Sequence, residues 1–480
     1  MVNRIQPHHG FILMVISIAV VIVVPDLLKQ GMFMDGQQYA CVAKNLANNK
    51  GTFWKPFLSE TWLIQGKNEF LEHPPLFYFF ESLAFRIVGE FYLTEKLFSL
   101  FTFIMHLFLI RLIWKETVGA EMKKNSWLSI FCWSLIPIVS WVFQNNMIEE
   151  LLSVFTMLSV FLTVKASHSK KGGYVFLFFS GLMVFCATLT KGLPGFFPVI
   201  VPLFIYLCFK KNNLFKAVSG SFILFLIPAL IYFFLFFFNQ EAKESLTFYI
   251  KNRLFHRISE QPSTDFRLFT IMGLMQELIP LIILLAIIFT ILKLKKKQIH
   301  FDHQINKTIL FFLLIGISAS FPLMMTMVQN KFYFFPALPY FAIAFALLIN
   351  LFGKQLVSKR LFLKKSKTLF IIGALMLVSS VAYSINQINK FSRDEKMIKD
   401  VVSIINYTGR NKNIGVEKEI YYQWNFQFYL LRYGDISIED SGKKHNYFIS
   451  FKNNSKQDSN YVASTVEMND YTLYRLKELR

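Results

Sequence analysis

Long apolar stretches recur along this chain, and their length matches the thickness of a lipid bilayer. Each stretch runs for about 16–23 residues, and a helix of ~20 apolar residues crosses the ~30 Å hydrocarbon layer. Hydrophobic residues make up 54% of the 480 residues, and the mean hydropathy is +0.42. A soluble chain of this length would keep a mostly polar surface. The sequence therefore predicts an all-α polytopic membrane protein.

Eleven crossings are expected from the apolar stretches and the charged loops between them. The amino terminus is then inside and the carboxyl terminus outside. The predicted crossings are 11–27, 95–114, 127–143, 150–166, 174–190, 193–209, 216–238, 273–292, 308–328, 333–352 and 368–385. Segment 74–89 is also apolar but short, so we predict a helix in the outer membrane interface, with a twelfth crossing as the alternative.

The net charge of +21 is concentrated in short loops between the apolar stretches. These loops include Lys123 and Lys124, Lys210 and Lys211, and the run KLKKK at 293–297. Cationic loops mark the cytoplasmic face of a membrane protein, and this placement argues against binding to nucleic acid. We therefore predict a multi-pass protein of the inner (cell) membrane.

The four cysteines indicate neither disulfides nor a thiolate metal site, because they form no CxxC pair. They are Cys41, Cys132, Cys186 and Cys208.

Two domains are predicted from the change in composition near residue 385. Residues 1–385 form the membrane domain, in which 28–94 is a long first extracytoplasmic loop with interfacial helices. Residues 386–480 have no long apolar run. NIGVEKEIYY, DISIED, NYFISFKN and YTLYRLK alternate as strands do, and YYQWNFQFYLLRYG fits an amphipathic helix. This tail predicts a small α/β domain on the outer side.

Acidic residues lie at the outer ends of the predicted helices. Asp35 stands in MDGQQYA, and Glu149 and Glu150 stand in NNMIEELL. Carboxylates near lipid are costly and are usually kept for function. The simpler alternatives are a helix cap for Asp35 and a solvated hairpin for the glutamates. Because both groups fall on one side, the sequence favours an enzyme.

Isolated cations on the same side indicate an anion site. Lys191 in LTKGLPGFFP and Lys331 in QNKFYFFPALP each precede a helix start that contains proline, where backbone N–H groups favour an anion. Snorkelling to the interface is the alternative for each lysine. The run Glu72-His73-Pro74-Pro75 adds a carboxylate and an imidazole, or forms a simple interfacial turn.

Taken in order, these segments resemble the membrane-embedded glycosyltransferases of the GT-C fold. Within this fold, the chain most resembles the enzymes that use lipid-phosphate sugars: the aminoarabinose transferases of lipid A and the protein O-mannosyltransferases. The resemblance covers roughly residues 30–350. It is carried by Asp35 with Tyr39, EHPPLFYFF, NNMIEELL, LTKGLPG and KFYFFPALPYFAIAF.

The resemblance implies transfer of a sugar from a polyprenyl-phosphate donor to an acceptor on the outer face, with inversion. Asp35 would activate or orient the acceptor, supported by the second acid. Glu149 is preferred to Glu150 because the following residues then match the family's spacing. Lys191, Lys331, Tyr39 and Tyr333 would hold the lipid phosphate.

Two departures from the family pattern affect phosphate binding. The family commonly has Arg at the position of Gln38 and Lys at that of His73, so the donor would depend more on Lys191, Lys331 and the loop with Arg253 and Arg257. A divalent metal between Glu72 and His256 is the one cofactor that the resemblance implies.

Two other classes of function stay open from the sequence. One is a polyprenyl-lipid flippase or transporter, although the predicted spans hold few polar groups. The other is a non-catalytic membrane scaffold, because the changes at Gln38 and His73 fit a decayed site. The sequence names neither the sugar nor the acceptor, which is a lipid, a protein or a glycan.

Overall fold

The computed structural model describes residues 6–62, 68–169, 172–211, 213–255, 268–297, 302–325, 328–354, 356, 366–440, 442–452 and 460–477. Within these residues, nine helices are long and apolar enough to cross a membrane. They are α1 (Pro7–Leu27), α4 (Thr94–Thr117), α7 (Glu149–His168), α8 (Gly173–Lys191), α10 (Leu214–Phe238), α13 (Phe269–Leu294), α14 (His303–Ser320) with η4 (Phe321–Met325), η5 (Lys331–Ala337) with α15 (Leu338–Gly353), and α17 (Ser366–Ile385). The chain is a multi-pass membrane protein, as predicted.

The two remaining predicted crossings have a different form from the nine. The first is a pair, α5 (Trp127–Ser134) and α6 (Pro137–Gln144), bent by 76° between Lys123–Ser134 and Pro137–Gln144. Pro137 opens α6, where its missing N–H costs nothing, and so fixes the break. The second is the shorter apolar helix Leu193–Phe209, made of η2 (Leu193–Ile200) and α9 (Val201–Phe209).

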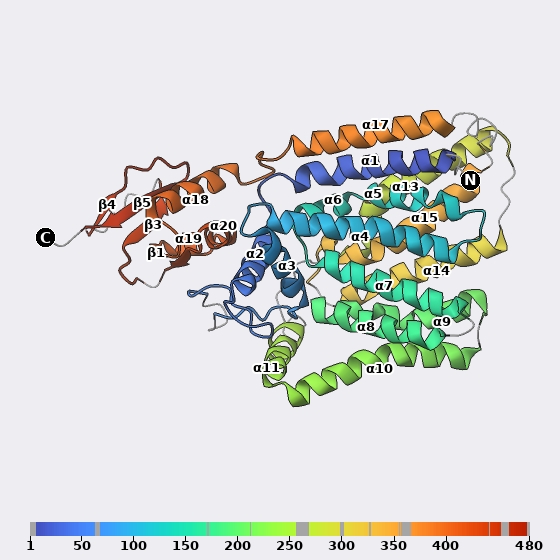
Figure 1. Ribbon diagram of the computed structural model, residues 1–480, viewed down its shortest axis with the longest axis horizontal. Helices are drawn as coiled ribbons and strands as arrows, with labels where there is room; N and C mark the ends of the chain where they lie inside the picture. Colours follow the sequence, from blue (N-terminus) through green and yellow to red (C-terminus); the bar gives the residue numbers. More distant parts are fainter. Residues whose placement is uncertain are drawn as a thin grey trace.

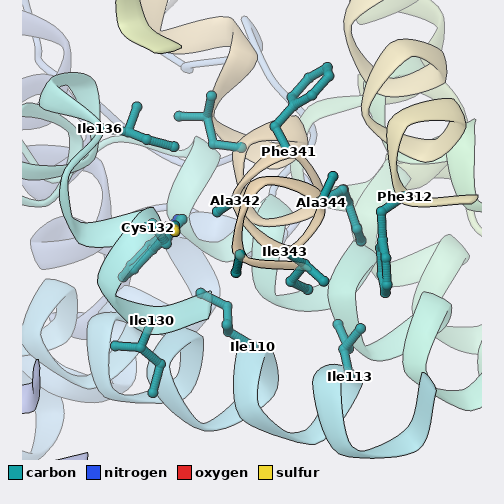
Figure 2. Close-up of a cluster of buried hydrophobic side chains, with 14 of the residues drawn as sticks. Ile110, Ile113, Ile130, Cys132, Ile136, Phe312, Phe341, Ala342, Ile343 and Ala344 are labelled. Atoms are coloured by element: carbon teal, nitrogen blue, oxygen red, sulfur yellow. The ribbon is translucent and has the colours of Figure 1, made fainter. Parts of the chain in front are cut away.

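The core of the membrane domain is built around α15. In the span Lys331–Gly353, 83% of the most apolar window is buried inside the protein. The corresponding value for α10 is 11%, so α10 borders the lipid. Figure 2 shows Ile110 and Ile113 of α4, Cys132 of α5 and Phe312 of α14 around Ile343 of α15. At the edge of the bundle, α1 and α17 lie side by side (Figure 1). Gly10 and Gly373 allow their backbones to approach closely.

Short helices cover one end of the bundle. These are α2 (Met34–Ala47), α3 (Leu76–Val88) and α11 (Gln240–Tyr249), and they lie at the end that carries the C-terminal domain (Figure 1). With 13 residues, α3 is roughly 20 Å long and is too short to cross the hydrocarbon layer. It packs on α2 and α4 as an interfacial helix would.

The C-terminal part is a mixed sheet with helices. Its strands are β1 (Asn413–Val416), β2 (Ser437–Glu439), β3 (Tyr447–Phe451), β4 (Tyr461–Ala463) and β5 (Tyr471–Leu476), in the order β2-β1-β3-β5-β4. β1 pairs in parallel with β2 and β3, and the other pairs are antiparallel. The helices are α18 (Glu395–Thr408), α19 (Lys418–Tyr421) and α20 (Trp424–Gly434). The predicted α/β character is confirmed, and the helix predicted over 421–434 is found from Trp424 onward. The strand predicted over 413–422 is wrong in its second half, because it ends at Val416 and residues 418–421 form α19.

Buried charges join this part to the membrane domain. The Arg432 guanidinium of α20 pairs with Glu95 of α4 at 2.7 Å, and both side chains are 1% exposed. Lys44 of α2 donates to the carbonyls of Leu431 and Arg432 at 2.7 and 3.0 Å. Each of these buried cations would be costly without its partner, so the two contacts fix the orientation of α20 on α2 and α4.

Candidate functional site

The half-buried Asp35 lies in the first turn of α2, which packs closely on the turn before α7. A Cβ at Gly36 would collide with the carbonyl oxygen of Asn145, so only glycine permits this approach. The Asn146 side-chain amide donates to the Gly36 carbonyl at 3.2 Å, and the Phe33 N–H donates to the Asn145 side chain at 2.7 Å. These bonds fix the start of α2 beside the start of α7.

The two adjacent glutamates at the start of α7 have different surroundings. Both are fully buried. Glu150 accepts hydrogen bonds from Ser99 Oγ at 3.1 Å, Thr102 Oγ1 at 2.6 Å and Met147 N at 3.1 Å. Glu149 pairs through Oε1 with Lys191, and among the described residues its Oε2 has no hydrogen-bond partner. Glu149 therefore keeps an oxygen for further contacts, whereas Glu150 is saturated.

Lys191, the last residue of α8, lies against aromatic rings of η5. Its Nζ is 4.4 Å from the centre of the Tyr333 ring and 5.8 Å from that of Phe332. The Tyr249 hydroxyl of α11 donates to the Lys191 carbonyl at 3.4 Å. The lysine is 8% exposed, so its charge is held by Glu149 and by the ring faces.

Tyr39 of α2 lies close to His73 and interacts electrostatically with Asp35 and Glu149. Its hydroxyl lies 3.5 Å from Nε2 of His73. Burial raises the pKa of Tyr39 well above its usual value, and the charges of Asp35 and Glu149 add to the shift. Asp35, His73 and Glu149 are thus within electrostatic or hydrogen-bonding reach of one phenol.

Two further predicted residues have ionic partners nearby. Arg253 pairs with Glu72, so a metal bound to Glu72 would have to compete with a guanidinium. Lys331 donates to Gln276 at 2.8 Å and lies 3.8 Å from Glu277. Lys331 therefore points toward α13, although Tyr333 in the same element contacts Lys191.

Two predicted residues, His256 and Arg257, lie outside the described residues. The part of the chain that the structure describes contains no group of three or more His, Cys, Asp or Glu side chains arranged to hold a metal ion.

The sequence did not single out the residues that join these groups. The Asn146 amide, which reaches Gly36, also donates to Glu81 Oε1 of α3 at 2.6 Å. The side-chain oxygen of Asn146 lies 3.3 Å from Ser99 Oγ, which shares its proton between this oxygen and Glu150. Asn146 has a φ of 51°, which asparagine tolerates better than most residues. Asn146 stands in the segment NNMIEELL and Glu81 is a single acid within the apolar segment 74–89, so no local pattern points to these contacts.

Comparison with solved structures identifies the fold of this chain. No protein-family model and no curated protein matches the sequence. The chain is similar to the solved structure of ArnT from Cupriavidus metallidurans bound to undecaprenyl phosphate, with a TM-score of 0.65 and 12% identity over 97% of this chain and 98% of that chain. The apo state of ArnT gives a TM-score of 0.64 and 11% identity, with 97% of each chain covered.

A second similar structure comes from an archaeon. It is the oligosaccharyltransferase AglB from Archaeoglobus fulgidus in complex with an inhibitory peptide and a dolichol-phosphate, with a TM-score of 0.50 and 13% identity over 92% of this chain and 69% of that chain. At these identities the similarities establish the fold alone. The chain has the GT-C fold, as the sequence predicted.

Proposed function

We propose that this protein transfers a glycosyl group from a polyprenyl-phosphate-linked sugar to an acceptor on the extracytoplasmic side of the membrane, with inversion. The observation that supports this most is the buried Glu149–Lys191 pair beside the start of α2, which carries Asp35. A cation held between a carboxylate and aromatic rings suits the departure of a phosphate. Structures with this fold have been solved with undecaprenyl phosphate and with dolichol-phosphate bound.

The reaction is a single displacement at the anomeric carbon. The acceptor oxygen forms the new bond while the bond from the anomeric carbon to the phosphate oxygen breaks, and the polyprenyl phosphate leaves with the electron pair. Asp35 takes the acceptor proton as the general base, which is typically worth ~10²–10⁴-fold in rate. Attack opposite to the leaving group inverts the configuration.

The leaving phosphate is stabilised by the cations of the candidate site. Lys191 is the first of these, and Glu149 holds it in place until the donor binds. The Tyr333 ring contacts Lys191, and Tyr39 interacts electrostatically with Glu149 and Tyr333, so both phenols belong to the same group of side chains. Arg253 and Lys331, now paired with Glu72 and with Gln276, are further cations that a phosphate would attract.

The proposal is tested with purified protein in lipid nanodiscs and a panel of synthetic polyprenyl-phosphate sugars. Membrane extract from a deletion strain supplies acceptors, and released polyprenyl phosphate is measured by mass spectrometry. We expect Asp35→Asn to lower release by about 10²-fold or more while lipid-phosphate binding persists. Asp26→Asn is the matched control, because Asp26 lies in the last turn of α1 and pairs with Lys29 at 2.7 Å.

Release by Asp35→Asn within a few-fold of the parent would contradict the proposal. Binding of polyprenyl phosphate that depends on Lys191 would favour the enzyme over a scaffold, and the absence of any lipid-phosphate preference would favour the scaffold.

A further inference from the structure

A polar groove lies between the first outer loop and the C-terminal sheet. Its volume is about 720 Å³, within the ~300–1,000 Å³ range of ligand sites. One wall comes from Asn45 near the end of α2 and from residues 50–60. The other comes from the start of β1, Ser437 of β2, and residues 444–447 ahead of and within β3. The groups that we place in the transfer reaction do not line this groove.

The two walls are joined firmly beneath the groove. Ser59 Oγ donates to Ser437 Oγ at 3.1 Å, and Thr61 Oγ1 donates to the Ile438 carbonyl at 2.8 Å, both in buried positions. On the loop side, the Asn45 amide donates to the carbonyls of Phe57 and Leu58 at 3.1 and 2.9 Å. The groove is therefore preformed and would lose little entropy on binding a ligand.

The lining is rich in groups that bond to hydroxyls. Asn411, Asn413 and Asn446 present side-chain amides, each of which both donates and accepts, and Tyr447 adds a phenol. Such a lining suits a ligand that carries many hydroxyl groups, and an apolar ligand would leave these groups without partners.

The charge in the groove is positive on balance. Three lysines line it, Lys50, Lys412 and Lys444, against the two acids Glu60 and Asp435. Asp435 is paired with the buried Lys44 at 2.9 Å and lies 3.6 Å from Lys50, so Lys412 and Lys444 are the groove lysines farther from it. The lysines therefore leave an excess of positive charge for a ligand.

We propose that this groove binds an anionic oligosaccharide, and that it holds the glycan part of the acceptor. The second clause rests on the proposed glycosyl transfer. Asn45 stands on the same helix as Asp35, ten residues further along, so the groove lies roughly 15 Å along α2 from that carboxylate. A chain of a few sugars spans that distance. The C-terminal domain then selects acceptors by their negative charge.

The test is binding to the full-length protein in phosphatidylcholine nanodiscs, measured by calorimetry. The probes are hexameric oligogalacturonate, neutral maltohexaose and inorganic phosphate. We expect oligogalacturonate to bind best, and the double variant Lys412→Glu/Lys444→Glu to weaken it about tenfold, because two favourable charge pairs become repulsive. Lys396→Glu is the matched control, since Lys396 is an exposed lysine of α18 away from the groove.

Three results would overturn the proposal. The first is equal weakening by Lys396→Glu, which would indicate unspecific attraction. The second is binding of phosphate or maltohexaose as tight as that of oligogalacturonate. The third is loss of oligogalacturonate binding in nanodiscs of phosphatidylglycerol, which would assign the groove to lipid head groups.

The test is independent of the transfer reaction. Asp35→Asn should bind oligogalacturonate like the parent, so a failure of the groove proposal and a failure of the proposed transfer are distinguishable. In a transfer assay, the double lysine variant should raise the acceptor KM and leave kcat within a few-fold.

Discussion

Glu149 and Glu150 are neighbours in the chain, but their carboxylates meet opposite conditions. Glu150 is surrounded by hydroxyl and amide donors from Ser99, Thr102 and Met147, so its role is to hold α7 against α4. Glu149 meets a single ammonium group, that of Lys191. A buried charge with one partner is costly unless it serves a function, and so the reaction is expected to depend on Glu149.

We predict that replacing Glu149 by glutamine mainly lowers activity, whereas replacing Glu150 by glutamine mainly lowers stability. Glu149→Gln should lower transfer by about 10²-fold, because Lys191 loses the carboxylate that orients it. Glu150→Gln should lower stability by about 1–3 kcal/mol, because an amide nitrogen replaces an acceptor oxygen, and it should keep activity per folded molecule. Thermal unfolding together with kcat per folded protein separates the two. Equal loss of activity in both variants would contradict the assignment.

Glu81 is a residue whose protonation state the fold controls. It lies in α3 and is fully buried, and burial raises the pKa of its carboxyl well above the usual 4.5, with the charge of Glu95 adding to the shift. The folded protein therefore keeps a proton that the unfolded chain releases as the pH rises past about 4.5. Stability from this group is complete below that pH and is lost as the pH rises through the folded pKa.

We predict that Glu81→Gln removes this pH dependence. The amide oxygen can still accept from Asn146, and the side chain stays neutral at every pH. The melting temperature of the variant relative to the parent should therefore rise between pH 5 and pH 8. Glu419→Gln, at an exposed carboxylate of α19, controls for the loss of one charge. A difference from the parent that is the same at both pH values would refute the prediction.

At the scale of elements, α20 of the C-terminal part helps to hold α2 in place. The Tyr429 hydroxyl accepts from the Met32 N–H at 3.1 Å, three residues before Asp35. Lys44 and Arg432 add the buried contacts that join α20 to α2 and α4. The C-terminal part and the helix bundle therefore depend on each other for their local geometry.

The Arg432–Glu95 pair provides the stability test of this docking. Arg432→Met should cost about 3–5 kcal/mol, because Glu95 is left charged and buried without its partner. Adding Glu95→Gln should recover most of the loss. Arg410→Met is the control, since its pair with Glu90 is exposed and worth about 1 kcal/mol or less. Thermal unfolding of these three variants and the parent tests the prediction. Equal effects of Arg432→Met and Arg410→Met would contradict it.

The elements that the sequence predicted well are those with a strong local pattern. The long apolar helices, α2 after Asp35 and α20 follow from periodicity and length alone. The break at Pro137 was missed because a proline within an apolar run also fits a continuous span with a kink. Strand β4 was missed because Tyr461–Ala463 has no alternating residues around it, whereas the equally short β2 lies within the alternating DISIED.

The partners of the site residues depend on packing that no local pattern encodes. Lys191 meets Glu149 across 42 positions of sequence, and Arg432 meets Glu95 across 337. The sequence could place the charged residues at one face of the membrane, because loop charges set the topology. It could not say that Lys331 turns toward Gln276, which depends on how η5 packs against α13.

At the scale of the whole molecule, the proposed transfer requires one orientation in the membrane. The N-terminus and the C-terminal domain lie at opposite ends of the helix bundle (Figure 1). The helices α2 and α3 lie at the domain end, and with them Asp35 and the start of α7. Lysine-rich loops such as Lys123 to Asn125 join helices at the far end. Because such loops stay in the cytoplasm, the candidate site and the outer domain are expected to face the extracytoplasmic side.

Cysteine labelling in spheroplasts tests this orientation. The native cysteines interfere little, because Cys41, Cys132 and Cys208 are buried and Cys186 is partly buried. Positions 418, in α19, and 124 are both exposed. We predict that an impermeant maleimide labels Lys418→Cys in intact spheroplasts and labels Lys124→Cys only after permeabilisation. The parent chain measures the background. The reverse pattern would place Asp35 and Glu149 in the cytoplasm, where a sugar carried by an outward-facing polyprenyl phosphate cannot reach them.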